Sequence, residues 1–103
     1  MKMLLTTVED TFTVTNRGVI IAPFFSVKKY RFNTNEKLMI EKPNGEKFLC
    51  DAYFQIPFIS PPPKELQYHC ALLKIEKSDV PIGSKVWILD KSKEQVVIEN
   101  GED

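Results

Sequence analysis

Two thiols and one imidazole are the side chains that most directly suggest a nucleophile–base pair. His69 is the single histidine and directly precedes Cys70, while Cys50 lies 20 residues before Cys70. A cysteine nucleophile needs an imidazole within hydrogen-bond reach of its thiol. On a strand, adjacent side chains point to opposite faces, which separates His69 from Cys70. A meeting of His69 with Cys50 across strands stays open, but we interpret both cysteines as small apolar fillers.

Metal and nucleotide sites have no support in the sequence. The cysteines show no C-x-x-C spacing. A structural zinc site usually needs four cysteine or histidine ligands, and this chain has two cysteines and one histidine. No G-x-x-x-x-G-K-[ST] phosphate loop is present. Glu41 and Asp51 have no partner at the spacing of an acid–base pair. We therefore expect a protein that is not an enzyme and that has no cofactor, metal or nucleotide.

Residues 28–32, with the sequence KKYRF, carry the sharpest functional signal. Basic side chains interleaved with aromatic rings can pair with phosphates and stack on bases. On a strand, Lys28 and Tyr30 would share one face with Phe32, and the remaining bases the other, which divides the charge. We prefer a solvated structural strand, then a protein-binding surface, then an RNA surface. The candidate contacts for a partner or for RNA are Arg17, Lys28, Lys29, Tyr30 and Arg31.

Several other aromatic residues lie in expected loops beside prolines. They are Phe24, Phe25 and Phe58, the last followed by Ile59. Loop aromatics either pack over the ends of a core or form an exposed anchor for a partner. We favour packing over the core.

Length and charge limit the class of protein. A chain of 103 residues corresponds to one domain with a modest core. The 14 basic and 14 acidic residues give a formal net charge of zero. Residues 90–103 hold five acids and two bases, net −3, and residues 1–89 hold twelve bases and nine acids, net +3. A surplus of three positive charges is small for binding nucleic acid through its phosphates.

The N-terminal sequence has too few apolar residues for a signal peptide, and no run approaches the roughly 20 apolar residues of a membrane-spanning helix. We expect a cytoplasmic protein with no membrane partner and with both cysteines reduced.

Alternating polar and apolar residues predict a series of short strands. The clearest strands are residues 11–15, 19–21, 37–42, 47–56 and 85–89, separated by turns at 16–18, 33–35, 43–45 and 79–83. Leu38 and Ile40 face inward. Along 47–56, alternate residues from Phe48 to Ile56 share one face, and Leu49 lies on the other. Gly18 takes the left-handed position of a three-residue hairpin loop. Pro23 ends the second strand or confines it to an edge, because it has no N–H to pair.

Two segments leave alternatives open. Residues 66–75 fit a strand or a helix, with the strand slightly favoured. Residues 96–98 can add an edge strand before a frayed end at 99–103. Residues 1–89 then form the domain and 90–103 an acidic tail. About six strands with regular turns predict an all-β fold, a small closed Greek-key barrel with at most a short helical turn.

Residues 12–21 (FTVTNRGVII) and 78–87 (SDVPIGSKVW) carry a family resemblance. The first resembles the opening strand pair, F-x-I-x-G-R-G-T-V-V, of the second domain of elongation factor Tu and related translational GTPases. The second is similar to the segment before that domain's last strand, and residues 72–74 fit its L-L-R-G strand. The resemblance covers roughly residues 5–89 and is closest to short stand-alone bacterial proteins of the elongation-factor-Tu-like type.

The resemblance implies a six-stranded Greek-key barrel, without the nucleotide-binding domain of the full factors. Only Arg17 and Gly18 match the G-R-G motif, because Asn16 and Val19 replace its first glycine and its threonine, and Pro23 replaces a glycine that usually follows. The aminoacyl-tRNA contacts of the family are therefore not carried over. We expect a binding module that docks a protein, with an RNA- or ribosome-associated accessory factor as the alternative.

Overall fold

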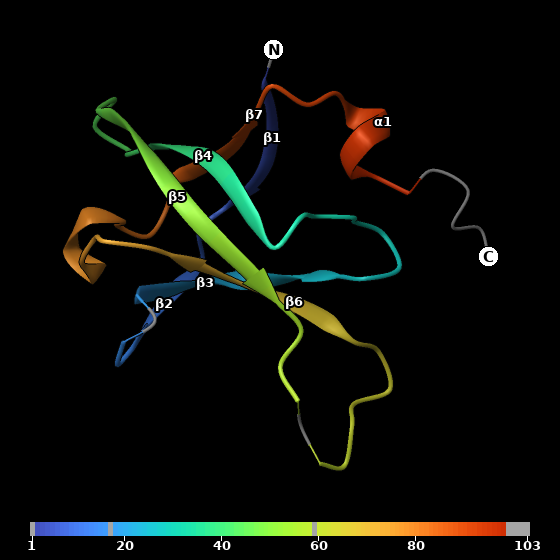
Figure 1. Cartoon of the computed structure of the whole chain (residues 1–103). Helices are drawn as coiled ribbons and strands as arrows, with labels where there is room; N and C mark the ends of the chain where they lie inside the picture. The colour runs from blue at the N-terminus through green and yellow to red at the C-terminus, as the bar shows by residue number, and fades with distance from the viewer. Residues whose placement is uncertain (1, 17, 59, 99–103) are drawn as a thin grey trace.

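The protein is an antiparallel β-sheet with very little helix (Figure 1). The computed structural model describes residues 2–16, 18–58 and 60–98. Its elements are β1 (Lys2–Thr7), β2 (Asp10–Val14), β3 (Gly18–Ser26), β4 (Asn35–Glu41), β5 (Lys47–Gln55), β6 (Gln67–Leu72), the 3₁₀ turn η1 (Lys77–Asp79), β7 (Lys85–Leu89) and α1 (Lys93–Val96). The expected all-β class is confirmed.

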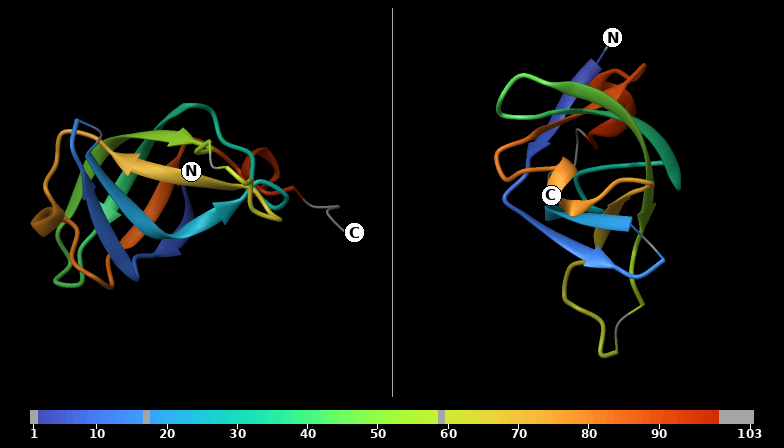
Figure 2. Two further views of the ribbon diagram at one scale, coloured as in Figure 1. Left: turned by 90° about the horizontal axis from the view of Figure 1, so that it is seen from below. Right: turned by 90° about the vertical axis from the view of Figure 1, so that its left-hand side faces the viewer.

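The sheet curls around its core but does not close (Figure 2). Its seven strands run in the order β1-β7-β4-β5-β6-β3-β2. The Val8 N–H donates to the Ser84 carbonyl at 2.8 Å, and the Glu9 N–H donates to the Ala22 carbonyl at 2.8 Å. The chain thus changes partner from the β7 side to the β3 side between β1 and β2.

The expected closed barrel of about six strands is therefore wrong. Residues 2–7 form an additional strand that pairs with β7, and the described strands make a half-barrel. The physical reason is that β1 and β2 are successive parts of one bent segment. The two residues between them, Val8 and Glu9, do not form a hairpin turn, because their N–H groups bond to Ser84 on the β7 side and to Ala22 of β3, so β1 and β2 lie end to end.

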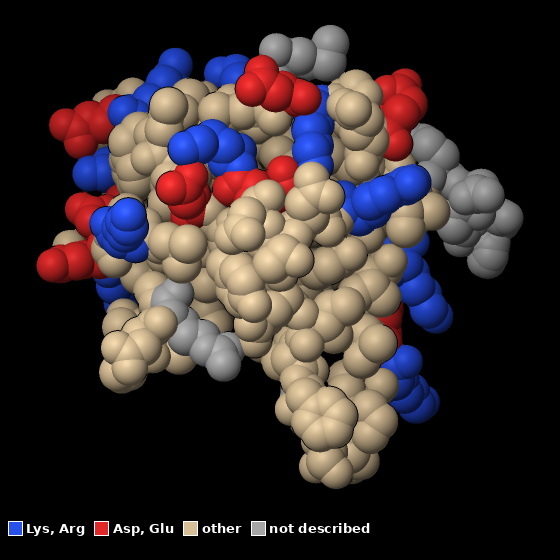
Figure 3. All heavy atoms as spheres, viewed as in Figure 1, with Lys and Arg blue, Asp and Glu red and all other residues tan. Residues whose placement is uncertain are grey.

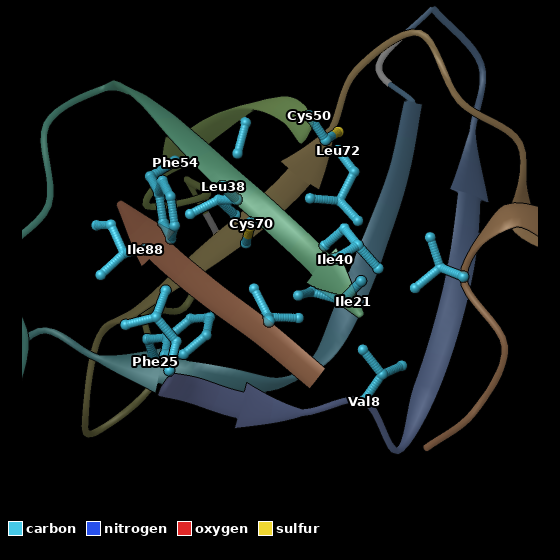
Figure 4. Close-up of a cluster of buried hydrophobic side chains, with 14 of the residues drawn as sticks. Val8, Ile21, Phe25, Leu38, Ile40, Cys50, Phe54, Cys70, Leu72 and Ile88 are labelled. Carbon is cyan, nitrogen blue, oxygen red and sulfur yellow. The ribbon is translucent and has the colours of Figure 1, made fainter. Parts of the chain in front are cut away.

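The core lies inside the curl and consists of the inward residues of nearly every strand (Figure 4). Leu38 and Ile40 of β4 are fully buried, as expected, and so are Val86 and Ile88 of β7. Each such side chain stabilises the fold by roughly 1.5–3 kcal/mol relative to an exposed one. Alternation along the strands thus sets both the core and the outer face.

Strand β3 extends further than expected. It continues through Pro23 to Ser26, so the prediction that proline ends the strand is wrong. The pairing with β2 stops at Ala22 and the part after Pro23 pairs with β6 alone, so the alternative prediction, that proline confines the strand to an edge, holds for this part. The register with β6 shifts between Ile21 and Phe25. A local irregularity of this kind accommodates a residue that has no N–H for the ladder.

Residues 28–32 do not form the expected strand. Residues 27–29 form a turn, and Tyr30 makes one isolated bridge to Val97. In contrast, the ambiguous segment 66–75 contains strand β6, so its strand interpretation is confirmed. Residues 96–98, which could have added an edge strand, form the single bridge between Val97 and Tyr30 and no longer strand.

The segment after β7 packs onto the body of the protein. Val96 of α1 is 0% exposed, and its carbonyl accepts the Arg31 N–H at 2.7 Å. The Lys91 ammonium lies 2.7 Å from the buried carboxylate of Glu36. Residues 91–97 thus cover one end of the curl, while 99–103 lie outside the described residues.

Candidate functional site

The basic residues of segment 28–32 are separated from its aromatic rings. Lys28, Lys29 and Arg31 are exposed; we call these three residues the basic turn. Tyr30 stacks on Phe32 with centroids 5.7 Å apart, and Phe32 in turn stacks on Phe54 of the core at 4.1 Å. These rings are therefore engaged inside the protein, whereas the bases face solvent. The remaining candidate contact, Arg17, lies outside the described residues.

The histidine and the cysteines do not assemble a reactive pair among themselves. The His69 ring stacks on Phe24 at 4.1 Å, and its partial burial lowers the pKa of the imidazole. Cys70 is fully buried, and this burial raises the pKa of its thiol. The Cys50 thiol, whose pKa burial also raises, donates to the Asp51 carbonyl at 3.3 Å. Both cysteines are free, buried and held in the protonated form that is a poor nucleophile.

Within the described ranges, no group of three His, Cys, Asp or Glu side chains is placed to hold a metal ion. Among the same residues, no helix has the length and apolar character required to cross a membrane.

A row of apolar side chains crosses the outer face of the sheet. Its four members, which we call the outer row, are Leu4 of β1, Trp87 of β7, Met39 of β4 and Leu49 of β5. Leu4 pairs with Trp87, Trp87 with Met39, and Met39 with Leu49. Directly paired residues of antiparallel strands lie on the same face. Leu49 is 63% exposed and Leu4 is 43% exposed, so the row is open to solvent.

Charged residues border the outer row on both sides. Lys2, Lys37 and Asp51 occupy outward positions two residues away on one side, and Lys47, Glu41 and Lys85 do so on the other. The Trp87 indole N–H donates to Glu41 at 3.1 Å, and the Lys2 ammonium lies 4.5 Å from the ring centroid. Four lysines against two carboxylates leave this border with a surplus of two positive charges.

No family model, curated protein or solved structure matches this chain. The case for a site therefore depends on the geometry of the chain itself.

A second apolar surface lies in the β5–β6 loop, residues 56–66. Phe58 is 99% exposed, and Ile56 and Leu66 are also among the exposed large apolar side chains. They line a shallow groove of about 330 Å³ together with prolines of the loop. The expectation that the loop aromatics pack over the core holds for Phe25, which is buried, and is wrong for Phe58.

The sequence pattern puts Leu49 on the same face of its strand as Asp51, but it does not reveal the outer row. An apolar residue on the polar face of an alternating strand is a signal that the sequence does contain. The row itself depends on which strands are neighbours in the sheet. That order places Leu4 beside Trp87, although the two residues are far apart in the sequence.

Proposed function

We propose that the protein is a non-enzymatic binding module that docks another protein through the outer row. The observation that carries the proposal is the continuous line from Leu4 to Leu49 across four strands, exposed at both ends. Exposed contiguous apolar patches that are rimmed by polar residues are a common mark of protein–protein interaction sites. An apolar centre with a polar border is also the usual anatomy of a protein interface.

The shape and charge of the row indicate the kind of surface it would meet. The row lies on the outer side of a curled sheet, so it forms a ridge that fits an apolar groove in the partner. Trp87 lies in the middle of the ridge, and tryptophan is among the residues that most often dominate binding energy. The positive border favours acidic residues around the partner's groove.

The resemblance to the second domain of elongation factor Tu supports docking rather than catalysis and remains part of the proposal. The alternative, an RNA- or ribosome-associated factor, depends on Arg17 and the basic turn. Stacking on bases requires accessible rings, and Tyr30 is instead packed against Phe25 and Phe32. This engagement favours a protein partner over RNA.

The test is affinity capture from native cell extract with three forms of the chain: wild type, Leu49→Glu and Phe12→Glu. Phe12 is a matched control because it is also an exposed apolar residue, with 45% of its surface accessible. It lies on β2, at the end of the sheet opposite to β1 and outside the four strands of the outer row. We expect Leu49→Glu to lower the captured partner's affinity at least ~10-fold, the range of an interface hot spot, and Phe12→Glu to leave it unchanged.

Ribonuclease and salt distinguish the two functions. Capture that survives both ribonuclease and high salt supports a protein partner, because contacts with phosphates weaken steeply as salt rises. Capture that disappears with ribonuclease would establish the alternative. Equal capture by wild type and Leu49→Glu would remove the outer row from the proposal.

A further inference from the structure

The β5–β6 loop projects from the sheet as a finger in which residues 56–63 are uncharged. In the view of Figure 1 it extends from the bottom of the molecule, away from the end where β1, β4 and β7 lie. Residues 56–63 contain no charged side chain. The space-filling view shows the projection with no charged side chain at its tip (Figure 3).

Prolines give the finger a restricted backbone. Pro57 precedes Phe58, and three consecutive prolines occupy positions 61–63. Proline fixes φ near −65°, so the chain loses little entropy when the loop is held by a ligand. The almost fully exposed ring of Phe58 is therefore carried by a loop with fewer backbone conformations than a loop without prolines.

The basic turn lies beside the base of this finger. The Val27 N–H donates to the Leu66 carbonyl at 3.2 Å, and the Ser26 hydroxyl donates to the carboxylate of Glu65. Lys28 and Lys29 follow directly after this connection, and the loop adds Lys64 on its returning side. Glu65 is the one acidic residue of the loop, so cations predominate beside the base of a finger whose tip is apolar.

We propose that the finger and the basic turn bind the surface of an anionic phospholipid membrane. The side chains of Ile56, Phe58 and Leu66 enter the boundary between headgroups and acyl chains, where aromatic and aliphatic groups are favoured. The lysines and Arg31 remain at the level of the lipid phosphates, where each cation adds to the attraction. The protein then lies on the membrane and does not cross it.

Lipid fits these observations better than the other ligands that carry phosphate. A nucleic acid needs hydrogen-bonding groups and several accessible rings, whereas residues 56–63 offer one ring among prolines and aliphatic residues. In Figure 1 the finger extends away from the end where β1, β4 and β7 lie, and these strands carry three of the four residues of the outer row, so membrane binding is proposed independently of the protein docking.

The test is co-sedimentation of the full chain with vesicles of phosphatidylcholine alone and of phosphatidylcholine mixed with phosphatidylserine. We expect binding to the mixed vesicles only. Phe58→Ser should weaken it at least ~5-fold through lost apolar transfer, and Lys28→Glu with Lys29→Glu at least ~10-fold through charge. Phe12→Ser, the matched control, should bind like wild type.

A depth measurement separates insertion from surface attraction. Trp87 is the single tryptophan of the chain, so Phe58→Trp in a Trp87→Phe background places the only indole at the tip. We expect its emission to shift to shorter wavelength with mixed vesicles and to be quenched by brominated acyl chains.

Three results would overturn the proposal: no binding to mixed vesicles, binding that Phe58→Ser leaves intact, or an indole at position 58 that brominated lipids do not quench. Binding of a single-stranded RNA oligonucleotide in place of vesicles, lost in the double charge reversal, would instead assign the basic turn to RNA. Each of these results leaves the capture experiment on the outer row unaffected.

Discussion

At the scale of single residues, Gly18 occupies the position that tolerates a side chain least. Its φ is +98°, and a Cβ placed on it would overlap the carbonyl oxygen of Leu72 on β6. The hairpin loop and the β3–β6 contact therefore both require glycine there. Gly45, in the β4–β5 turn, has nearly the same φ of +96° but no atom within 4 Å of such a Cβ. A substitution at Gly45 therefore measures backbone strain alone, and the same substitution at Gly18 measures strain together with steric overlap.

We predict that Gly18→Ala lowers the free energy of unfolding by about 3 kcal/mol, because strain and overlap add. Gly45→Ala should lower it by about 1 kcal/mol, the cost of the left-handed conformation alone. Urea denaturation of both variants measures the difference. Equal losses would mean that β3 moves away from Leu72 without penalty.

Residue-level prediction from the sequence succeeded where local geometry decides and failed where distant packing decides. Gly18 was placed in the left-handed position because a hairpin loop of three residues requires it. Tyr30 and Phe32 were assigned by strand alternation, which does not apply to a segment that forms a turn. Their inward orientation depends on Phe25 and Phe54, which come from two other strands.

At the scale of elements, α1 shows how a single turn of helix becomes part of a core. Four residues form no stable helix alone, so contacts with the body must hold this one. Val96 is completely buried, and the next residue, Val97, is bridged to Tyr30 and partly exposed. In the sequence, Val96, Val97 and Ile98 form a small apolar cluster that can add an edge strand here. The local sequence pattern does not show which residues they pack against.

We predict that Val96→Ala destabilises the protein by about 2 kcal/mol through lost burial and the cavity that remains. Val97→Ala is the control and should cost clearly less, because its backbone bridge is retained and its side chain is partly exposed. Thermal or urea unfolding of the two variants gives the comparison. If Val96→Ala proved as mild as Val97→Ala, α1 would not be an integral cover of the core.

At the scale of the whole molecule, the order of strands creates features that no single segment contains. The outer row joins residues 4, 39, 49 and 87, and the finger meets the basic turn across the β3–β6 pairing. Sequence patterns predicted the all-β class and most strands but not their neighbours. The expectation of no membrane partner rested on the absence of a long apolar run, which a surface-inserting loop does not need.

The open sheet also determines how stability is distributed along the chain. β4 and β5 have partners on both sides, whereas β1 and β2, at the two ends of the strand order, each have one. In a strand that has a neighbouring strand on both sides, the amide hydrogen bonds break mainly when the whole protein unfolds. In an edge strand they break by local unfolding, which has a lower free energy. A closed barrel would make all strands alike in this respect.

We therefore predict that peptides from β4 and β5 are the last to exchange in hydrogen–deuterium exchange followed by mass spectrometry. Peptides covering β1 and β2 should exchange at least ~10-fold faster, because fraying at an edge breaks one ladder instead of two. β6, which also lies between two strands, is the internal control and should behave like β4 and β5. Equal protection of β1, β2 and the central strands would show that the ends of the sheet are closed in solution, by pairing with each other or with a second molecule.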